Sequence, residues 1–146
     1  MAERLITIAE KHDCETFRIS GCEPFIGPLS VEHYFQVLDL LRAWSPRSYV
    51  VIETDGVCIG AHQEILDRFP MNHIKLRISL KGHDEALSQE VTGAKGSHQL
   101  QLAAIIAASS KIYRHLHTNV AIMDGIVDIK RLSLPINIGI EREQLM

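Results

Sequence analysis

The chain lacks the features that mark membrane, secreted and nucleic-acid-binding proteins. No apolar run in its 146 residues approaches the roughly 20 residues that span a bilayer, and the N-terminus lacks the basic start and long apolar centre of a signal peptide. Lys and Arg are not concentrated in any segment, and 15 basic against 18 acidic residues leave a formal charge of -3. We therefore expect no membrane partner, no nucleic-acid partner and a cytoplasmic location.

Cysteine is also scarce. Cys14, Cys22 and Cys58 are odd in number and widely spaced, unlike a disulfide framework, a zinc ribbon or an iron–sulfur ligand run. We expect all three to be reduced, and Cys14 and Cys58 to be buried as small apolar residues. Because Cys14 precedes an expected strand and Cys22 follows it, the two should lie at its opposite ends and cannot share one metal cluster.

The eight histidines do not form a metal-ligand pattern. His115 and His117 are two positions apart, which places both on one face of a strand, but the sequence supplies no third ligand beside them. The other six occur at polar positions, where surface exposure is expected, namely His12, His33, His62, His73, His83 and His98.

Apolar periodicity predicts one α/β domain over residues 1–146, and 46% apolar residues are enough for a buried core. Helices are expected at 2–12, from a Ser30 cap to about 41, at 62–69 and at 97–113. Strands are expected at 16–19, 49–52, 74–80, 116–123 and 136–140, with a loop at 21–29 and a Gly-rich connection at 82–96. Strands that alternate with helical crossovers indicate a parallel sheet or barrel.

The expected strands at 49–52 and 74–80 differ in pattern. Residues 49–52 are β-formers without alternation, which predicts a strand covered on both faces. In residues 74–81, Ile and Leu alternate with Lys, Arg and Ser. Either this second strand lies at an edge of the sheet, or its polar face lines a cavity.

Three of the expected strands end in polar, glycine-bearing segments. These segments are Gly21-Cys22-Glu23-Pro24, Glu53-Thr54-Asp55-Gly56 and Ser79-Leu80-Lys81-Gly82. Because ligands of parallel α/β folds bind beyond the carboxyl ends of the strands, we expect these segments to share a site. Gly21 permits a positive φ, and Pro24 is expected to hold Glu23 outward. A carboxylate, a hydroxyl and an ammonium together suit a zwitterionic, hydroxyl-bearing ligand.

These segments resemble strand ends of radical S-adenosylmethionine enzymes. RISGCEP resembles the glycine-glycine-glutamate motif of that family, YVVIETDG resembles its third strand, and KLRISLKG with Thr92-Gly93-Ala94 resembles its fourth. The likeness covers residues 1 to about 123 and is nearest to uncharacterised relatives of glycyl-radical activating enzymes. It implies a partial (β/α)6 barrel that lacks its first strand.

The resemblance also implies binding roles for single residues. Gly21 and Glu23, followed by Pro24, would bind the amino group of S-adenosylmethionine. Thr54 and Asp55 would shape the floor of the site, and Glu53 would support a neighbouring backbone group or ion. Ser79 would contact the ribose region, with Lys81 as a polar contact nearby.

The chain departs from the family at the metal centre. The family holds a [4Fe–4S] cluster with cysteines spaced C-x3-C-x2-C in a loop before the first helix, and this pattern is absent here. The chain therefore resembles an N-terminally shortened member. Cys22 replaces the usual second glycine, and Asp55 replaces asparagine, which exchanges a donor-acceptor amide for a carboxylate.

Three hypotheses follow. In the first, the chain is a shortened radical S-adenosylmethionine protein whose complete form cleaves the cofactor and forms a radical on an unknown substrate. In the second, it is a remnant that binds S-adenosylmethionine without radical chemistry. In the third, it is an unrelated α/β module that associates through an open sheet edge. Asp124, at a further expected strand end, could belong to the site or to a turn.

Overall fold

The protein folds as alternating helices and strands. The computed structural model describes residues 2–21, 23–45, 49–69, 74–110, 116–123 and 139–143. Its helical elements are α1 (Ala2–Lys11), α2 (Pro28–Trp44), α3 (Val57–Ala61), the 3-10 helix η1 (Gln63–Arg68), α4 (Glu85–Thr92) and α5 (Ser97–Ser110). Its strands are β1 (Thr16–Ile19), β2 (Tyr49–Thr54), β3 (Ile74–Leu80), β4 (Leu116–Met123) and β5 (Gly139–Glu143).

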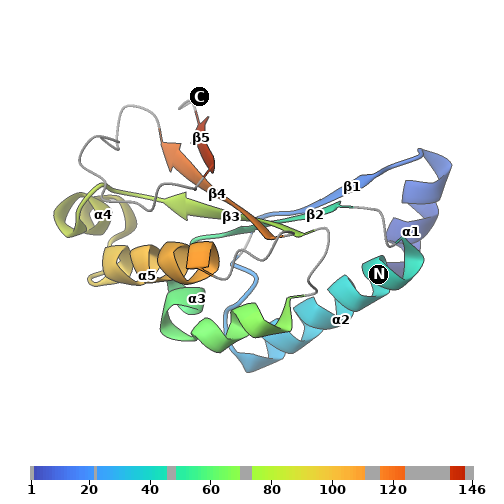
Figure 1. The fold of residues 1–146 in the computed structure, drawn as a ribbon, viewed down its shortest axis with the longest axis horizontal. Helices are drawn as coiled ribbons and strands as arrows, with labels where there is room; N and C mark the ends of the chain where they lie inside the picture. The colour runs from blue at the N-terminus through green and yellow to red at the C-terminus, as the bar shows by residue number, and fades with distance from the viewer. Residues whose placement is uncertain are drawn as a thin grey trace.

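The five strands form one parallel sheet in the order β1-β2-β3-β4-β5. Each strand pairs with the next along the chain, so every connection is a crossover to an adjacent position. The helices α2, α3 and α5 lie together on one side of the sheet (Figure 1). The structure thus confirms a parallel α/β sheet alternating with helices.

The core lies between the sheet and this helical layer. Ile52 on β2 and Leu76, Ile78 and Leu80 on β3 are fully buried, and they pack with the apolar stripe of α2 that the sequence predicts. The opposite face of β2 is more accessible, since Tyr49 is 39% exposed. The prediction that this strand is covered on both faces is therefore wrong.

The polar alternation of β3 has a specific cause. β3 pairs with β2 on one side and β4 on the other, so it is an internal strand and the edge alternative is wrong. Its apolar residues face the layer of α2, α3 and α5, and its polar residues face the opposite side of the sheet, where the described residues form no covering helix. The outer strands of the described sheet are β1 and β5 instead.

The start of α2 and the presence of α4 differ from the sequence prediction. α2 begins at Pro28 after Gly27, whereas Ser30 was the expected cap, because Pro is favoured in the first helical turn. The connection 82–96 contains the helix α4, which was not predicted because the segment was interpreted as a Gly-rich loop. Asp84 caps that helix by accepting a hydrogen bond from the Leu87 amide, and Gly93 ends it in the left-handed conformation.

Other predicted elements are close to the observed ones. β1, β3 and β4 have the predicted bounds, and the expected helix at 62–69 is the 3-10 helix η1, preceded by the unpredicted α3. β5 begins at Gly139, and residues 111–113, 136–138 and Asp124 lie outside the described residues. None of the described helices combines the length and apolar character that crossing a lipid bilayer requires.

Candidate functional site

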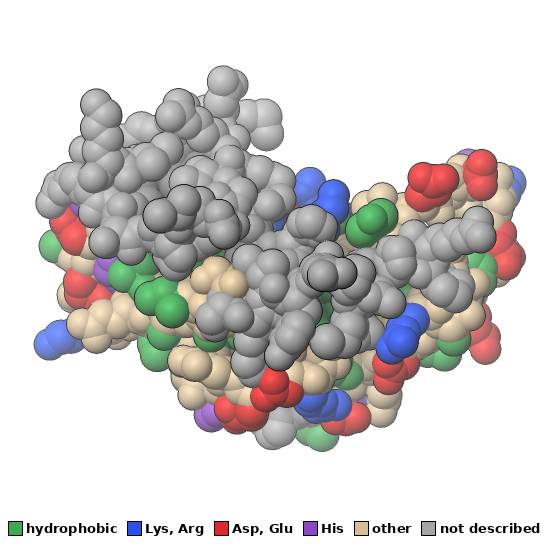
Figure 2. All heavy atoms as spheres, viewed as in Figure 1, with side chains coloured by type: hydrophobic (Ala, Val, Ile, Leu, Met, Phe, Trp, Pro, Cys, Tyr) green, Lys and Arg blue, Asp and Glu red, His purple; other side chains and the backbone are tan. Residues whose placement is uncertain are grey.

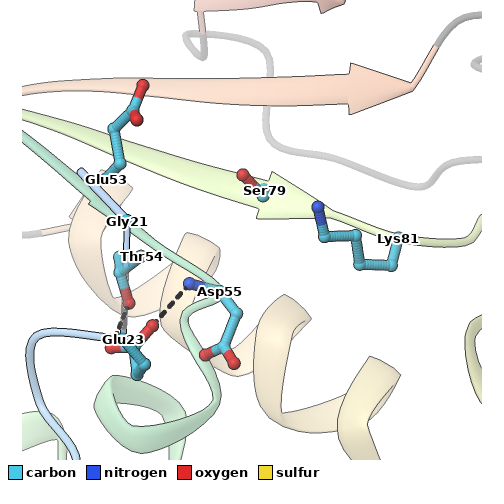
Figure 3. Close-up of a pocket in the computed structure, with 7 residues that line it drawn as sticks. All are labelled: Gly21, Glu23, Glu53, Thr54, Asp55, Ser79 and Lys81. Atoms are coloured by element: carbon cyan, nitrogen blue, oxygen red, sulfur yellow. Dashed lines mark hydrogen bonds between the residues drawn. The ribbon is translucent and has the colours of Figure 1, made fainter. Parts of the chain in front are cut away.

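A cavity of about 270 Å³ lies at the carboxyl ends of β1, β2 and β3 (Figure 3). Its lining residues come from the three polar segments identified in the sequence, namely Gly21, Glu23, Glu53, Thr54, Asp55, Ser79 and Lys81. The parallel sheet explains this arrangement, because strands of one direction bring their carboxyl ends to the same edge.

Six of the seven predicted site residues therefore lie around one cavity. The exception is Pro24, which does not line it. Glu53, expected only to support a neighbouring group, lines the cavity directly. The common position of these residues is a finding, whereas their binding role stays a prediction.

Glu23 is held by three donors from the protein itself. Its Oε1 accepts the Thr54 hydroxyl at 2.6 Å and the Phe25 amide at 3.3 Å. Its Oε2 accepts the Asp55 amide at 2.8 Å. The prediction that Glu23 points outward is therefore wrong, because the side chain is half-buried and joins the end of β1 to the end of β2 (Figure 3).

Burial raises the pKa of Glu23, and the negative charge of Asp55 acts in the same direction. The hydrogen bonds from Thr54, Asp55 and Phe25 stabilise the ionised form and only partly offset this increase. The Tyr34 hydroxyl is buried nearby and has no hydrogen-bond partner among the described residues, and its pKa is raised by burial and by the charge of Glu23. The sequence marks Tyr34 only as an apolar helix position, so its polar group was missed.

The turn after β2 is built from short-range contacts. The Thr54 hydroxyl accepts the Gly56 amide at 3.0 Å, and Asp55 Oδ1 accepts the Val57 amide at 2.9 Å, which begins α3. Gly56 has a φ of 79°, in the left-handed region. Gly21 likewise has a positive φ of 119°, as the sequence predicts.

Glu53 points to the opposite side of β2 from Thr54 (Figure 3). Its Oε1 accepts hydrogen bonds from Arg18 on β1 and from Arg77 on β3, the latter at 2.7 Å. Partial burial raises the pKa of Glu53, but the two guanidinium groups outweigh it, and the pKa is lowered overall. Sequence reasoning missed both arginines, although the alternation in residues 74–81 places Arg77 on this face.

Ser79 and Lys81 project from the end of β3 on the other side of the cavity (Figure 3). The backbone carbonyl of Ser79 accepts the side-chain amide of Gln101 on α5 at 3.2 Å. Gln101 is buried, and its Oε1 accepts no hydrogen bond from the part of the chain that the structure describes. The end of β3 is thereby fixed to α5, while the side chains of Ser79 and Lys81 remain on the cavity.

The described cysteines do not fit an iron–sulfur cluster. Cys14 precedes β1 and is exposed, which contradicts the prediction that it is buried. Cys58 is half-buried in α3, after β2, and its thiol donates to the Phe25 carbonyl at 2.7 Å. Because the strands are parallel, the two thiols lie at opposite ends of the strands, Cys14 at the amino end and Cys58 at the carboxyl end. Cys22 lies outside the described residues.

The histidine predictions are confirmed in part. His12, His33 and His62 are exposed as expected, whereas the His83 side chain is only 13% exposed and His98 is buried on α5, which contradicts their expected surface positions. His73 and His115 lie outside the described residues. Within the described ranges, no three His, Cys, Asp or Glu side chains are grouped closely enough to hold a metal ion.

The cavity has an uneven charge. Among the described lining residues, three carboxylates, from Glu23, Glu53 and Asp55, face one ammonium, from Lys81. Such a site favours a ligand with more positive than negative charge, and the hydroxyl of Ser79 can exchange hydrogen bonds with it. Comparison of the chain with models of known protein families and with curated proteins found no match.

Proposed function

We propose that this chain is a radical S-adenosylmethionine-type α/β protein, with a partial (β/α)6 barrel, and that it binds S-adenosylmethionine at the carboxyl ends of β1, β2 and β3. The observation that carries this proposal is the shared cavity of Glu23, Thr54 and Ser79, which come from three separate strand ends. The sequence resemblance assigns these same residues to the cofactor.

The charges of the ligand and the cavity are complementary. S-adenosylmethionine carries an ammonium, a sulfonium and one carboxylate, so positive charge is in excess. The part of the cavity wall that the structure describes has the opposite balance, with three carboxylates and one ammonium. In this arrangement Lys81 would bind the ligand carboxylate, and the acidic side would receive its ammonium.

Glu23 has the capacity to bind one more donor. A carboxylate offers about four lone-pair positions, and the three protein donors to Glu23 leave one of them. An ammonium placed there would be held by a side chain whose orientation is already fixed. Such preorganisation reduces the entropy lost on binding.

The size of the cavity limits what it encloses. At about 270 Å³ it lies just below the range of roughly 300–1,000 Å³ typical of whole small-molecule sites. We therefore assign the methionyl part of the ligand to the cavity, with the nucleoside extending from it beside Ser79.

A family member that holds the cluster would cleave S-adenosylmethionine reductively and form a radical on its substrate. The described cysteines of this chain do not fit the cluster, because Cys14 lies at the amino ends of the parallel strands and Cys58 at their carboxyl ends. This separation favours the second candidate function, in which the chain binds the cofactor without radical chemistry.

Calorimetry with S-adenosylmethionine tests the binding proposal. Ser79→Ala and Lys81→Met remove ligand contacts without breaking a side-chain hydrogen bond within the described residues. Each should weaken binding by about tenfold, the value of one charge-assisted or well-placed hydrogen bond. Ser30→Ala and Lys11→Met, on exposed helix surfaces, are the matched controls and should bind like the unmodified chain. Absence of binding by the unmodified chain would refute the proposal.

Reconstitution with iron and sulfide separates the two candidates. We expect no stoichiometric [4Fe–4S] uptake by this chain and no cofactor cleavage under reducing conditions. A full cluster with the associated visible absorption would reject the binding-only candidate. Neither result affects the calorimetric test, because that test uses the chain without metal.

A further inference from the structure

Several basic side chains of β3 and its end lie on the face of the sheet that carries no helix among the described residues. Lys75, Arg77, Ser79 and Lys81 follow one another at every second position of β3 and its end, so they share this face. Lys75 is exposed, and Arg77 retains 13% exposure of its side chain. Figure 2 shows a group of Lys and Arg side chains (blue) near the top centre of the view, on the side of the sheet opposite α2, α3 and α5 in Figure 1.

Arg18 on β1 adds a basic residue to the same face of the sheet. It pairs in register with Val51, which in turn pairs with Lys75, so Arg18 and Lys75 flank an apolar residue in one transverse row. The next row toward the cavity contains Glu53 and Arg77. Arg18 is 57% exposed although it bonds to Glu53, so its guanidinium lies at the surface.

The sign of charge changes between the cavity and the transverse row formed by Arg18, Val51 and Lys75. The face as a whole is mixed, because the register also places Glu53 on β2 and Glu141 and Glu143 on β5 at positions of this face. The row itself contains no carboxylate among the described positions, whereas the described lining of the cavity includes three carboxylates and one ammonium. The chain as a whole is acidic, with a formal charge of -3, so the basic row is a local feature.

We infer that the substrate that shares this site with S-adenosylmethionine carries a carboxylate or phosphate group, which binds at the row formed by Arg18, Val51 and Lys75. This inference rests on the proposed function. The cationic cofactor occupies the acidic cavity, and the anion occupies the basic row beside it. The positive charge of the cofactor then faces carboxylates, and the negative charge of the substrate faces Arg18 and Lys75. Val51 provides an apolar surface for the substrate atoms that lie between these two basic side chains.

The position of Glu53 separates the two subsites. Its carboxylate binds both arginines on one side and lines the cavity on the other. Because its pKa is lowered, Glu53 stays ionised at neutral pH, and with Glu23 and Asp55 it makes the cavity unfavourable for an anion. The anionic group is therefore directed to the Arg18 and Lys75 end of the face.

Nuclear magnetic resonance of the ¹⁵N-labelled full chain tests this inference. Inorganic phosphate and succinate are titrated separately at constant ionic strength, with chloride as the reference anion. We expect saturable shifts of the Val51 and Lys75 amides, and the tighter of the two anions identifies the substrate group. Shifts no larger than those with chloride for both anions would overturn the inference.

Variants assign the effect to the row. Lys75→Gln, at an exposed position, and Arg18→Gln should each weaken the anion by about tenfold. Lys11→Gln and Arg68→Gln are the matched controls, since Arg68 also bonds a glutamate, Glu32, at 2.9 Å but lies in the helical layer. Equal anion binding by Lys75→Gln and the unmodified chain would place the anion elsewhere and reject the inference.

The same samples are titrated with S-adenosylmethionine. Anion binding at the row without cofactor binding would retain the basic subsite and reject the proposed function. Cofactor binding without anion binding would retain the proposed function and reject this inference. The two failures are thus distinguishable.

Discussion

The carboxylate of Glu23 accepts the hydroxyl of Thr54 at 2.6 Å, although 31 positions separate the two residues in the chain. This bond joins the loop after β1 to the last residue of β2. Thr54 is only 4% exposed, so the contact is shielded from water on the side of the core. The candidate site is therefore part of the fold's internal bonding as well as a surface for a ligand.

Removal of the Thr54 hydroxyl should destabilise the protein. Thr54→Val keeps the shape of the side chain but leaves the Gly56 amide and one Glu23 oxygen without this partner. We expect a loss of about 1–3 kcal/mol in the free energy of unfolding, measured by urea denaturation. Thr7→Val, at an exposed position of α1, is the control and should change it by less than about 0.5 kcal/mol. Equal effects of the two variants would contradict the structural role of Thr54.

Binding of S-adenosylmethionine should weaken in acid. The ligand's ammonium needs the ionised form of Glu23, and burial raises the pKa of this group. Below that raised pKa, affinity should fall by about tenfold for each pH unit. Calorimetry over a pH series measures this change, and Glu23→Gln should show weak binding without the same dependence. Constant affinity of the unmodified chain across the series would exclude Glu23 as the ammonium ligand.

Glu53 should stabilise the protein at neutral pH. Its pKa is lowered in the folded state, so its contribution is present above the unfolded pKa and is lost as pH falls through the folded pKa. Glu53→Gln should cost about 1–2 kcal/mol near neutral pH, because Arg18 and Arg77 lose a shared charged acceptor. Urea denaturation at a series of pH values should show this difference shrinking in acid. Glu32→Gln, which breaks only an exposed pair with Arg68, should cost less than about 1 kcal/mol.

Gly56 should tolerate alanine less well than Gly93. Both have positive φ values, 79° and 72°, so both substitutions incur the cost of a left-handed backbone, about 1–2 kcal/mol. At Gly56 a Cβ would also lie 2.8 Å from Ile78 Cγ2, whereas at Gly93 it would have no heavy atom within 4 Å. We expect Gly56→Ala to lower the thermal midpoint further than Gly93→Ala. Equal midpoints would show that β3 moves to accommodate the added carbon.

The described cysteines should differ in reactivity. Cys14 is exposed, whereas the thiol of Cys58 donates to the Phe25 carbonyl. Burial, followed by the charges of Glu23, Asp55 and Glu64, raises the pKa of Cys58. Iodoacetamide should therefore label Cys14 faster than Cys58, as measured by peptide mass spectrometry over time. Denaturation in urea should remove most of the difference, and faster labelling of Cys58 in the folded chain would contradict its placement.

The positions of the strands could be predicted because their signals are local. β1 and β3 are bounded as predicted, since runs of β-formers between turn residues mark their ends. The common cavity also followed from local signals, because polar residues at the ends of parallel strands meet at one edge. Local signals also mark α4, namely the aspartate cap Asp84 and the helix formers that follow it, but the prediction gave more weight to the flanking glycines and missed this helix.

Contacts between distant residues could not be predicted. The bonds of Glu23 to Thr54 and of Glu53 to Arg18 depend on how β1 and β2 align in register. Without knowledge of that register, Glu23 was predicted to point outward and bind a ligand, and no role was predicted for the arginines. The burial of His98 likewise depends on how α5 packs. The first residues of α5 are mostly polar, so their sequence does not indicate which of them faces the core.

The sequential order of the sheet has a consequence for how the protein reaches its folded state. Each strand pairs with the strand that follows it along the chain, so no pairing has to wait for the two ends of the chain to meet. The sheet can grow one strand–helix–strand unit at a time, with a loop-closure cost of similar size at each step. The first such unit, from β1 through α2 to β2, already contains Glu23 and Thr54. The acidic half of the cavity can therefore form early in folding, before β3 supplies Ser79.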